Sequence, residues 1–229
     1  MKIIILAFLT FFSINVFSQE YNLKKRYIIW TFHTENTTVN GISLGAFPNL
    51  NDKSRFVKTN GIRLEIPGLG FLAPLGNGSP ISRIDSVSGK FNRKDYKFDE
   101  IINGINISTG TVGKVNYNGI TIGAIAQFGE LNNGIALAGI WNAMNKSNGI
   151  QISLLANEAL YSNGVQISLG NSAIIMNGLQ IGGNNYSKEM YGIQIGILNK
   201  SKNTKGLQIG IWNINEKRKF PILNWNFGK

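Results

Sequence analysis

A short motif recurs through the second half of the chain at intervals of 14 or 15 residues. Each copy has a Gly, usually preceded by Asn, and then an aliphatic, a polar or small, a second aliphatic and a small residue. The eight glycines are Gly104, Gly119, Gly134, Gly149, Gly164, Gly178, Gly192 and Gly206. Alternation of apolar and polar residues at a period of two predicts a short β-strand in every copy.

The length of the repeat indicates how these strands pair. In an antiparallel arrangement neighbouring strands point in opposite directions, so a directional motif would recur every second strand, after about 28–30 residues. Recurrence after 14 or 15 residues is typical of coils that stack in parallel. We therefore predict an all-β repeat protein, a stacked parallel β-solenoid with two short sides per coil. The alternative is an antiparallel transmembrane β-barrel, with aliphatic residues facing lipid and Gly, Gln and Ser facing inward.

Four regions follow from this pattern. Residues 1–18 combine an N-terminal Lys with an apolar run of about ten residues, which predicts a cleaved signal peptide and a mature chain that begins at Gln19. Residues 19–100 hold degenerate copies of the motif and a loop at 74–100, and we interpret them as an N-terminal cap of irregular early coils or a small β unit. Residues 101–215 are the repeat region, and residues 216–229, where the repeat breaks, are the C-terminal cap.

In a solenoid, we expect the aliphatic residues to form the core and the residues between them to face outward. Glycine gains no packing in a strand, so a column of small residues suggests close approach by a glycan chain or a second copy. A tight bend, or packing of the chain's own segment, explains the same column. The predicted binding face consists of Gln151, Gln166, Gln180, Gln194, Gln208, Gly182, Gly196 and Gly210.

Composition excludes most kinds of catalytic chemistry. The chain has no Cys and a single His, which excludes disulfides, thiol nucleophiles and thiolate metal sites. His33 and Glu35 form a weak acid–base candidate without a nucleophile, and the adjacent Asp99 and Glu100 would point to opposite faces of a strand. We therefore predict no catalytic residue, no cofactor and no metal, and hence no enzyme.

The chain is strongly basic, with a formal net charge of +11. Lysines and arginines cluster near the two ends of the mature chain and on expected turns. In an exported protein this charge favours anionic surfaces, such as envelope polysaccharide, over nucleic acid. The same residues also serve to keep a shaft of low charge in solution.

The C-terminal copies, 192–199 and 206–213, together with the ending Asn224-Trp225-Asn226-Phe227, resemble bacterial surface-repeat proteins of leptospires and secreted proteins of Bacteroidetes. The resemblance covers about half of the chain. It implies an exported protein at the cell surface or associated with the outer membrane. An extracellular location, membrane association and self-association are further options that the residues themselves leave open. The resemblance supplies no catalytic residues, and the Cys of lipid-anchored members is absent here.

Overall fold

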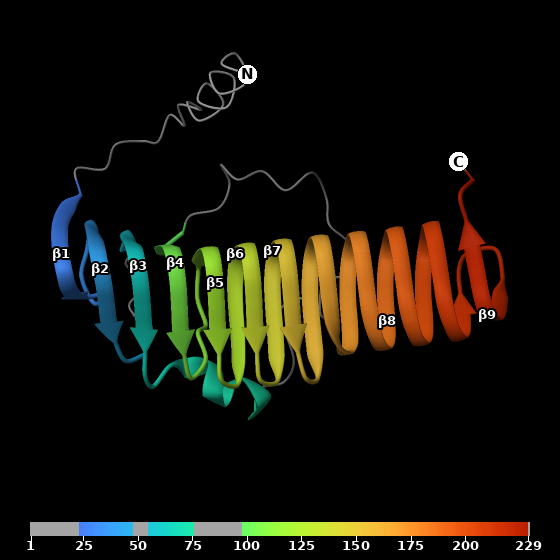
Figure 1. Cartoon of the computed structure of the whole chain (residues 1–229), viewed down its shortest axis with the longest axis horizontal. Helices are drawn as coiled ribbons and strands as arrows, with labels where there is room; N and C mark the ends of the chain where they lie inside the picture. Colours follow the sequence, from blue (N-terminus) through green and yellow to red (C-terminus); the bar gives the residue numbers. More distant parts are fainter. Residues whose placement is uncertain (1–22, 48–54, 76–97, 229) are drawn as a thin grey trace, which may run out of the picture.

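A computed structural model describes residues 23–47, 55–75 and 98–228 of the chain. Its strands form one sheet in chain order from β1 to β9, and it coils into the elongated stack shown in Figure 1. The elements are β1 (Lys24–Thr31), β2 (Thr37–Gly45), β3 (Val57–Glu65), the 3-10 helix η2 (Leu69–Leu75), β4 (Glu100–Ser108), β5 (Val115–Gly123), β6 (Ala126–Ala138), β7 (Trp141–Ser153), β8 (Ala156–Ile214) and β9 (Lys219–Asn226). The signal peptide predicted at 1–18 lies outside the described residues.

Every pairing from β1 to β8 is parallel. The repeat stays in register, because Gly104 pairs with Gly119 and the same alignment continues coil by coil to Gly164. β8 is long because its successive coils follow one another without a break in strand structure. The predicted parallel β-solenoid is therefore confirmed, and the antiparallel alternative is wrong.

The degenerate copies near the N-terminus form early coils of the same stack. Residues 40–42 pair with 60–62, and these pair with 103–105 across an insertion in the chain. Within that insertion η2 packs beneath the coils, where the Gly70 amide donates to the Gly110 carbonyl at 2.7 Å. Residues 76–97 of the predicted 74–100 loop lie outside the described residues. Coil length thus varies here while strand register is kept.

The side chains between the two aliphatic positions point into the coil. All five of the repeat glutamines are fully buried: Gln151, Gln166, Gln180, Gln194 and Gln208. The aliphatic neighbours face outward, and Ile193 and Ile195, on either side of Gln194, remain 39% and 38% exposed. The expectation that aliphatic residues form the core and glutamines the outer face is therefore wrong.

Stacked amides explain why this polar interior is stable. Each glutamine from Gln166 onward donates from Nε2 to Oε1 of the glutamine one coil earlier, at 2.8–3.0 Å. A second buried column runs Asn142, Asn157, Asn171, Asn185, Asn199 and Asn213, and donates in the opposite direction along the stack. Identical amides one strand spacing apart satisfy one another, so their burial does not carry the usual cost of unmade hydrogen bonds.

The opposite wall of each coil supplies the apolar part of the interior. Met176 and Met190 pack with Ala173, all almost fully buried. Nearer the N-terminus, Met144 packs with Tyr117 and its neighbours. The core is thus a thin layer between a wall of amides and a wall of methionine, alanine and a few larger apolar residues.

The glycine of each motif is required by the close approach of successive coils. Gly178 has a φ of +139°, and a Cβ built on it would lie 2.1 Å from the carbonyl oxygen of Gly164. A side chain here would meet both an unfavourable backbone conformation and a steric overlap with backbone atoms. The preceding residue adds a third amide column, in which Asn177 Nδ2 donates to Asn163 Oδ1 at 2.8 Å.

We expect Gly178→Ala to lower the free energy of unfolding by about 1–3 kcal/mol, because it forces this strain on the coil. Gly170→Ala is the control, since its Cβ would meet only the Leu155 carbonyl oxygen at 3.4 Å and its φ is not in the left-handed region. Urea unfolding followed by circular dichroism measures both. Equal losses in the two variants would contradict the requirement for glycine at position 178.

The C-terminal end of the stack is closed by β9, which pairs antiparallel with the last coil of β8. Its Asn224 continues the glutamine column, because Nδ2 donates to Gln208 Oε1 at 3.3 Å. Asn213, the last residue of the buried asparagine column, donates to the Phe220 carbonyl at 3.2 Å. β9 therefore covers the open edge of the sheet and ends both amide columns with hydrogen bonds.

Candidate functional site

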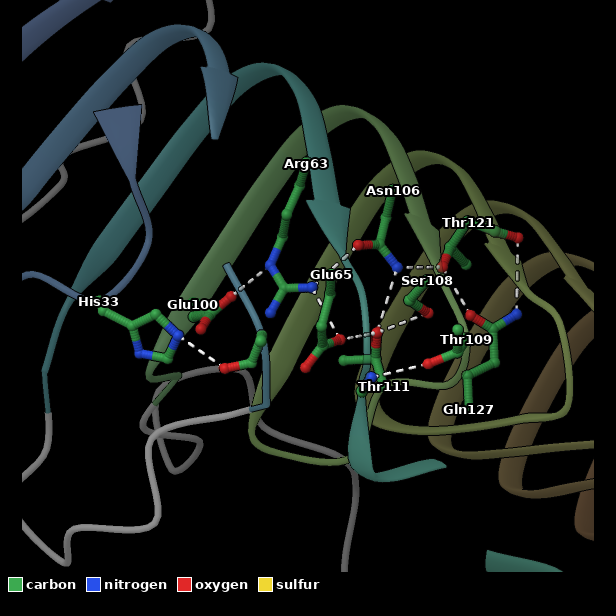
Figure 2. A network of polar contacts seen from close by, with 12 residues as sticks. His33, Arg63, Glu65, Glu100, Asn106, Ser108, Thr109, Thr111, Thr121 and Gln127 are labelled. Atoms are coloured by element: carbon green, nitrogen blue, oxygen red, sulfur yellow. Dashed lines mark hydrogen bonds and ion pairs between the residues drawn. The ribbon is translucent and has the colours of Figure 1, made fainter. Parts of the chain in front are cut away.

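A cluster of buried charges lies inside the early coils (Figure 2). Arg63 is fully buried and donates from Nε to Glu100 Oε2 at 2.7 Å and from Nη1 to Glu65 Oε2 at 3.0 Å. Arg55 donates to the other oxygen of Glu100 at 2.6 Å. The Arg63 guanidinium also lies 4.0 Å from the centre of the Phe32 ring. Two arginines and two glutamates thus neutralise one another in the interior, where all four are buried.

The environment shifts the pKa values of Arg63 and of a neighbouring tyrosine. Burial by itself lowers the pKa of Arg63, but the charges of Glu100 and Glu65 outweigh it and raise that pKa above its usual value. Burial raises the pKa of the neighbouring Tyr117 well above its usual value. Arg63 therefore stays charged and Tyr117 stays neutral at physiological pH. The cluster has the properties of a structural ion-pair network.

Sequence reasoning missed this cluster, although the repeat carried a signal for it. In the degenerate copy at 60–65, Arg63 stands where later copies have Gln, and Glu65 stands at the small-residue position. Arg63 is in register with Asn106, and Glu65 with Ser108. Once both of these strand positions are known to face inward, the opposite charges of Arg63 and Glu65 predict an ion pair in the interior.

The weak acid–base candidate is not assembled as a pair. His33 Nε2 donates to the Ala46 carbonyl oxygen at 2.8 Å. His33 and Glu35 line a small hollow of about 120 Å³ together with Arg55. Glu100, considered with Asp99 from sequence, belongs to the buried charge cluster. In the part of the chain that the structure describes, no group of three or more His, Cys, Asp or Glu is arranged to hold a metal ion.

The predicted binding face lies inside the solenoid. The five glutamines point inward, and the small residues pack against the preceding coil. A Cβ on Gly182 would lie 2.1 Å from the Ser168 carbonyl oxygen, and one on Gly196 would lie 2.1 Å from that of Gly182. Gly210 has the same environment, with the Gly196 carbonyl oxygen at 1.9 Å. The column of small residues is therefore explained by packing of each coil against the preceding one, and it does not require a partner.

What the solenoid presents to solvent on this side is an aliphatic face made of three columns. The first column is Ile62, Ile105, Ile120, Ile135, Ile150, Val165, Leu179, Ile193 and Leu207. The second column is Leu64, Ile107, Ile122, Leu137, Ile152, Ile167, Ile181, Ile195 and Ile209. The third column, five residues after each glycine from Gly119 onward, is Ala124, Gly139, Leu154, Leu169, Gly183, Ile197 and Ile211. These columns contain no charged residue.

The third column gives the aliphatic face its relief. Leu154 and Leu169 protrude and are 64% and 58% exposed. Glycines beside them leave two shallow apolar hollows, one of about 530 Å³ around Gly139 and one of about 550 Å³ around Gly183. The face is therefore flat along its first two columns and carries knobs and hollows along its third.

Both ends of the stack extend the aliphatic face. Trp225 and Leu223 in β9 pair with Leu207 and Ile209 and are partly exposed. At the other end Ile29 in β1 pairs with Ile42. The opposite outer side of the solenoid has a different character, because Lys200, Lys202 and Lys205 are exposed there, while Ser201 and Thr204 in the same segment are buried.

Comparisons with known proteins identify no relative of this chain. A scan against protein-family models finds no match, and no curated protein or solved structure matches the chain. Within residues 23–47, 55–75 and 98–228, no helix is long and apolar enough to cross a membrane.

Proposed function

We propose that this protein is an exported, non-catalytic repeat module that serves as a structural or interaction element of the cell surface or cell envelope. The observation that carries the proposal is the aliphatic face. Soluble monomers seldom expose a continuous apolar surface of more than a few hundred Å², and larger ones mark sites of association. This one runs along most of a stiff β-solenoid, which suits a rod that contacts partners along its length.

Two features of the sequence support the location. Residues 1–18 have the pattern of a secretory signal, and the last two copies resemble bacterial surface-repeat proteins. The exposed lysines opposite the aliphatic face suit contact with an anionic envelope polysaccharide. In this proposal the aliphatic face makes the protein contact and the basic side faces the envelope.

Fractionation of cells that express the full chain tests this function. We expect the protein in the envelope or medium, released by carbonate without detergent, with an intact mass that begins at Gln19 because the signal peptide is removed. A variant with Leu6 and Leu9 both changed to Arg, which interrupts the apolar run, is expected to remain inside the cell at full length. A parent protein found in the cytosol and still beginning at Met1 would overturn the proposal.

A further inference from the structure

We infer that the aliphatic face is covered by the same face of a second copy, so that two solenoids pack face to face as a homodimer. The inference takes from the proposed function only the role of this face as the contact surface. Three observations carry it: the size of the face, its self-complementary relief and the placement of charge.

The size suits a stable dimer. Rows of the aliphatic face are about 4.8 Å apart, and positions along a strand are about 3.3 Å apart. In the register described below, the rows from Ile105 to Trp225 overlap, and from the first column to the third this part of the face measures about 38 Å by 13 Å. Its projected area of about 500 Å² on each copy, before the relief of the side chains is counted, gives the total of roughly 1,000 Å² that a specific interface needs.

On either side of Leu169, the relief of the third column is complementary to itself about a two-fold axis. When the axis runs along the strand direction through the row of Leu169, the two solenoids lie antiparallel and Leu169 meets its own copy. Rows equally distant from the axis then oppose each other. The knob Leu154 meets the hollow at Gly183, and Ile197 meets the hollow at Gly139. One row further out, Ile211 meets the small Ala124. Such an isologous contact is self-limiting, because it closes on two copies.

Charge placement favours a second copy over a lipid surface. Lys200, Lys202 and Lys205 lie on the outer side opposite the aliphatic face. In a face-to-face dimer they point away from each other, which limits repulsion between two strongly basic chains. Binding to a bilayer through the aliphatic face would instead hold these lysines away from anionic headgroups, whereas membrane-surface segments combine basic and apolar residues at one interface.

Light scattering coupled to size-exclusion chromatography tests the dimer with the mature chain, 19–229. We expect a dimer of the parent. Leu169→Lys places two like charges opposite each other in the interface and is expected to weaken dimerisation by about 30-fold or more. Asn203→Lys makes the same charge change at an exposed site on the lysine side and is expected to leave the dimer intact. Circular dichroism checks that both variants are folded.

Crosslinking tests the register. The chain has no Cys, so Leu169→Cys introduces the only thiol. A short bismaleimide is expected to join two copies through position 169, because packed sheets are about 10 Å apart. Asn203→Cys is the control and is expected to remain uncrosslinked. Crosslinking of both variants to the same extent would overturn the proposed register.

The remaining outcomes separate this inference from the proposed function. A monomeric parent that floats with vesicles of phosphatidylethanolamine and phosphatidylglycerol would identify lipid as the occupant and overturn the dimer. A monomer that does not bind these vesicles, or a dimer unaffected by Leu169→Lys, would also overturn it. None of these results changes where the protein is found in the cell, which the fractionation experiment measures separately.

Discussion

Replacing Gln194 with lysine is expected to lower the free energy of unfolding by at least about 3 kcal/mol, because it places a charge in the interior without a counter-ion. Gln194 is fully buried and bonded to Gln180 on one side and Gln208 on the other. Ile195→Lys, one residue later, adds the same charge at a position that faces outward. We expect it to cost about 1 kcal/mol or less in the monomer, since the lysine stem still covers its neighbours.

Gln194→Met separates the charge from the loss of the amide. Methionine has nearly the same shape, and Gln208 Nε2 keeps its bond to the Ile214 carbonyl at 3.0 Å. We expect an intermediate loss of about 1–3 kcal/mol. Urea unfolding at one low protein concentration measures all three variants. A stable Gln194→Lys protein beside an unfolded Ile195→Lys protein would show that the aliphatic columns face inward after all.

The second large effect is expected at the buried charge cluster. Arg63→Met removes the cation that bonds both Glu65 and Glu100 and leaves excess negative charge in the interior. Breaking a buried ion pair from one side costs about 3–5 kcal/mol. The control is Lys58→Met, which removes the same charge from an outward-facing position of the same strand and is expected to cost about 0.5 kcal/mol or less.

A compensating change distinguishes charge balance from lost packing. Arg63→Met combined with Glu65→Gln removes one charge of each sign from the cluster, while Arg55 still bonds Glu100. We expect this double variant to recover part of the stability lost in Arg63→Met alone, as measured by thermal unfolding. Equal stability of Arg63→Met and Lys58→Met would show that the cluster does not contribute to the fold.

The repeat alone was sufficient to predict the secondary structure, the parallel pairing and the register. Parallel coils place each residue on its counterpart in the next coil, so the spacing of Asn118-Gly119-Ile120 and its copies translates directly into strand pairing. Degenerate copies such as 60–62 follow the same rule despite the long insertion, because the close approach at the glycine still has to be met.

The side of each strand that faces inward was decided by the tertiary structure. A period of two marks two faces without stating which is buried, and the usual expectation that aliphatic residues are inside failed at Ile193, Gln194 and Ile195. That expectation rests on the cost of burying an amide without a partner. In a stack of like residues each glutamine finds its partner in the next coil, so the cost is removed.

The charged cluster and the cap also depended on contacts between distant segments. Arg63 meets Glu100 because strands separated by an insertion become neighbours in the stack, and β9 turns back to lie antiparallel on the last coil. The sequence by itself determined a solenoid and its register, because stacking repeats local chemistry at every coil. Which residues form its core and which form its contact surface depended on the closed coil, where glutamines can bond across coils and isoleucines are left facing outward.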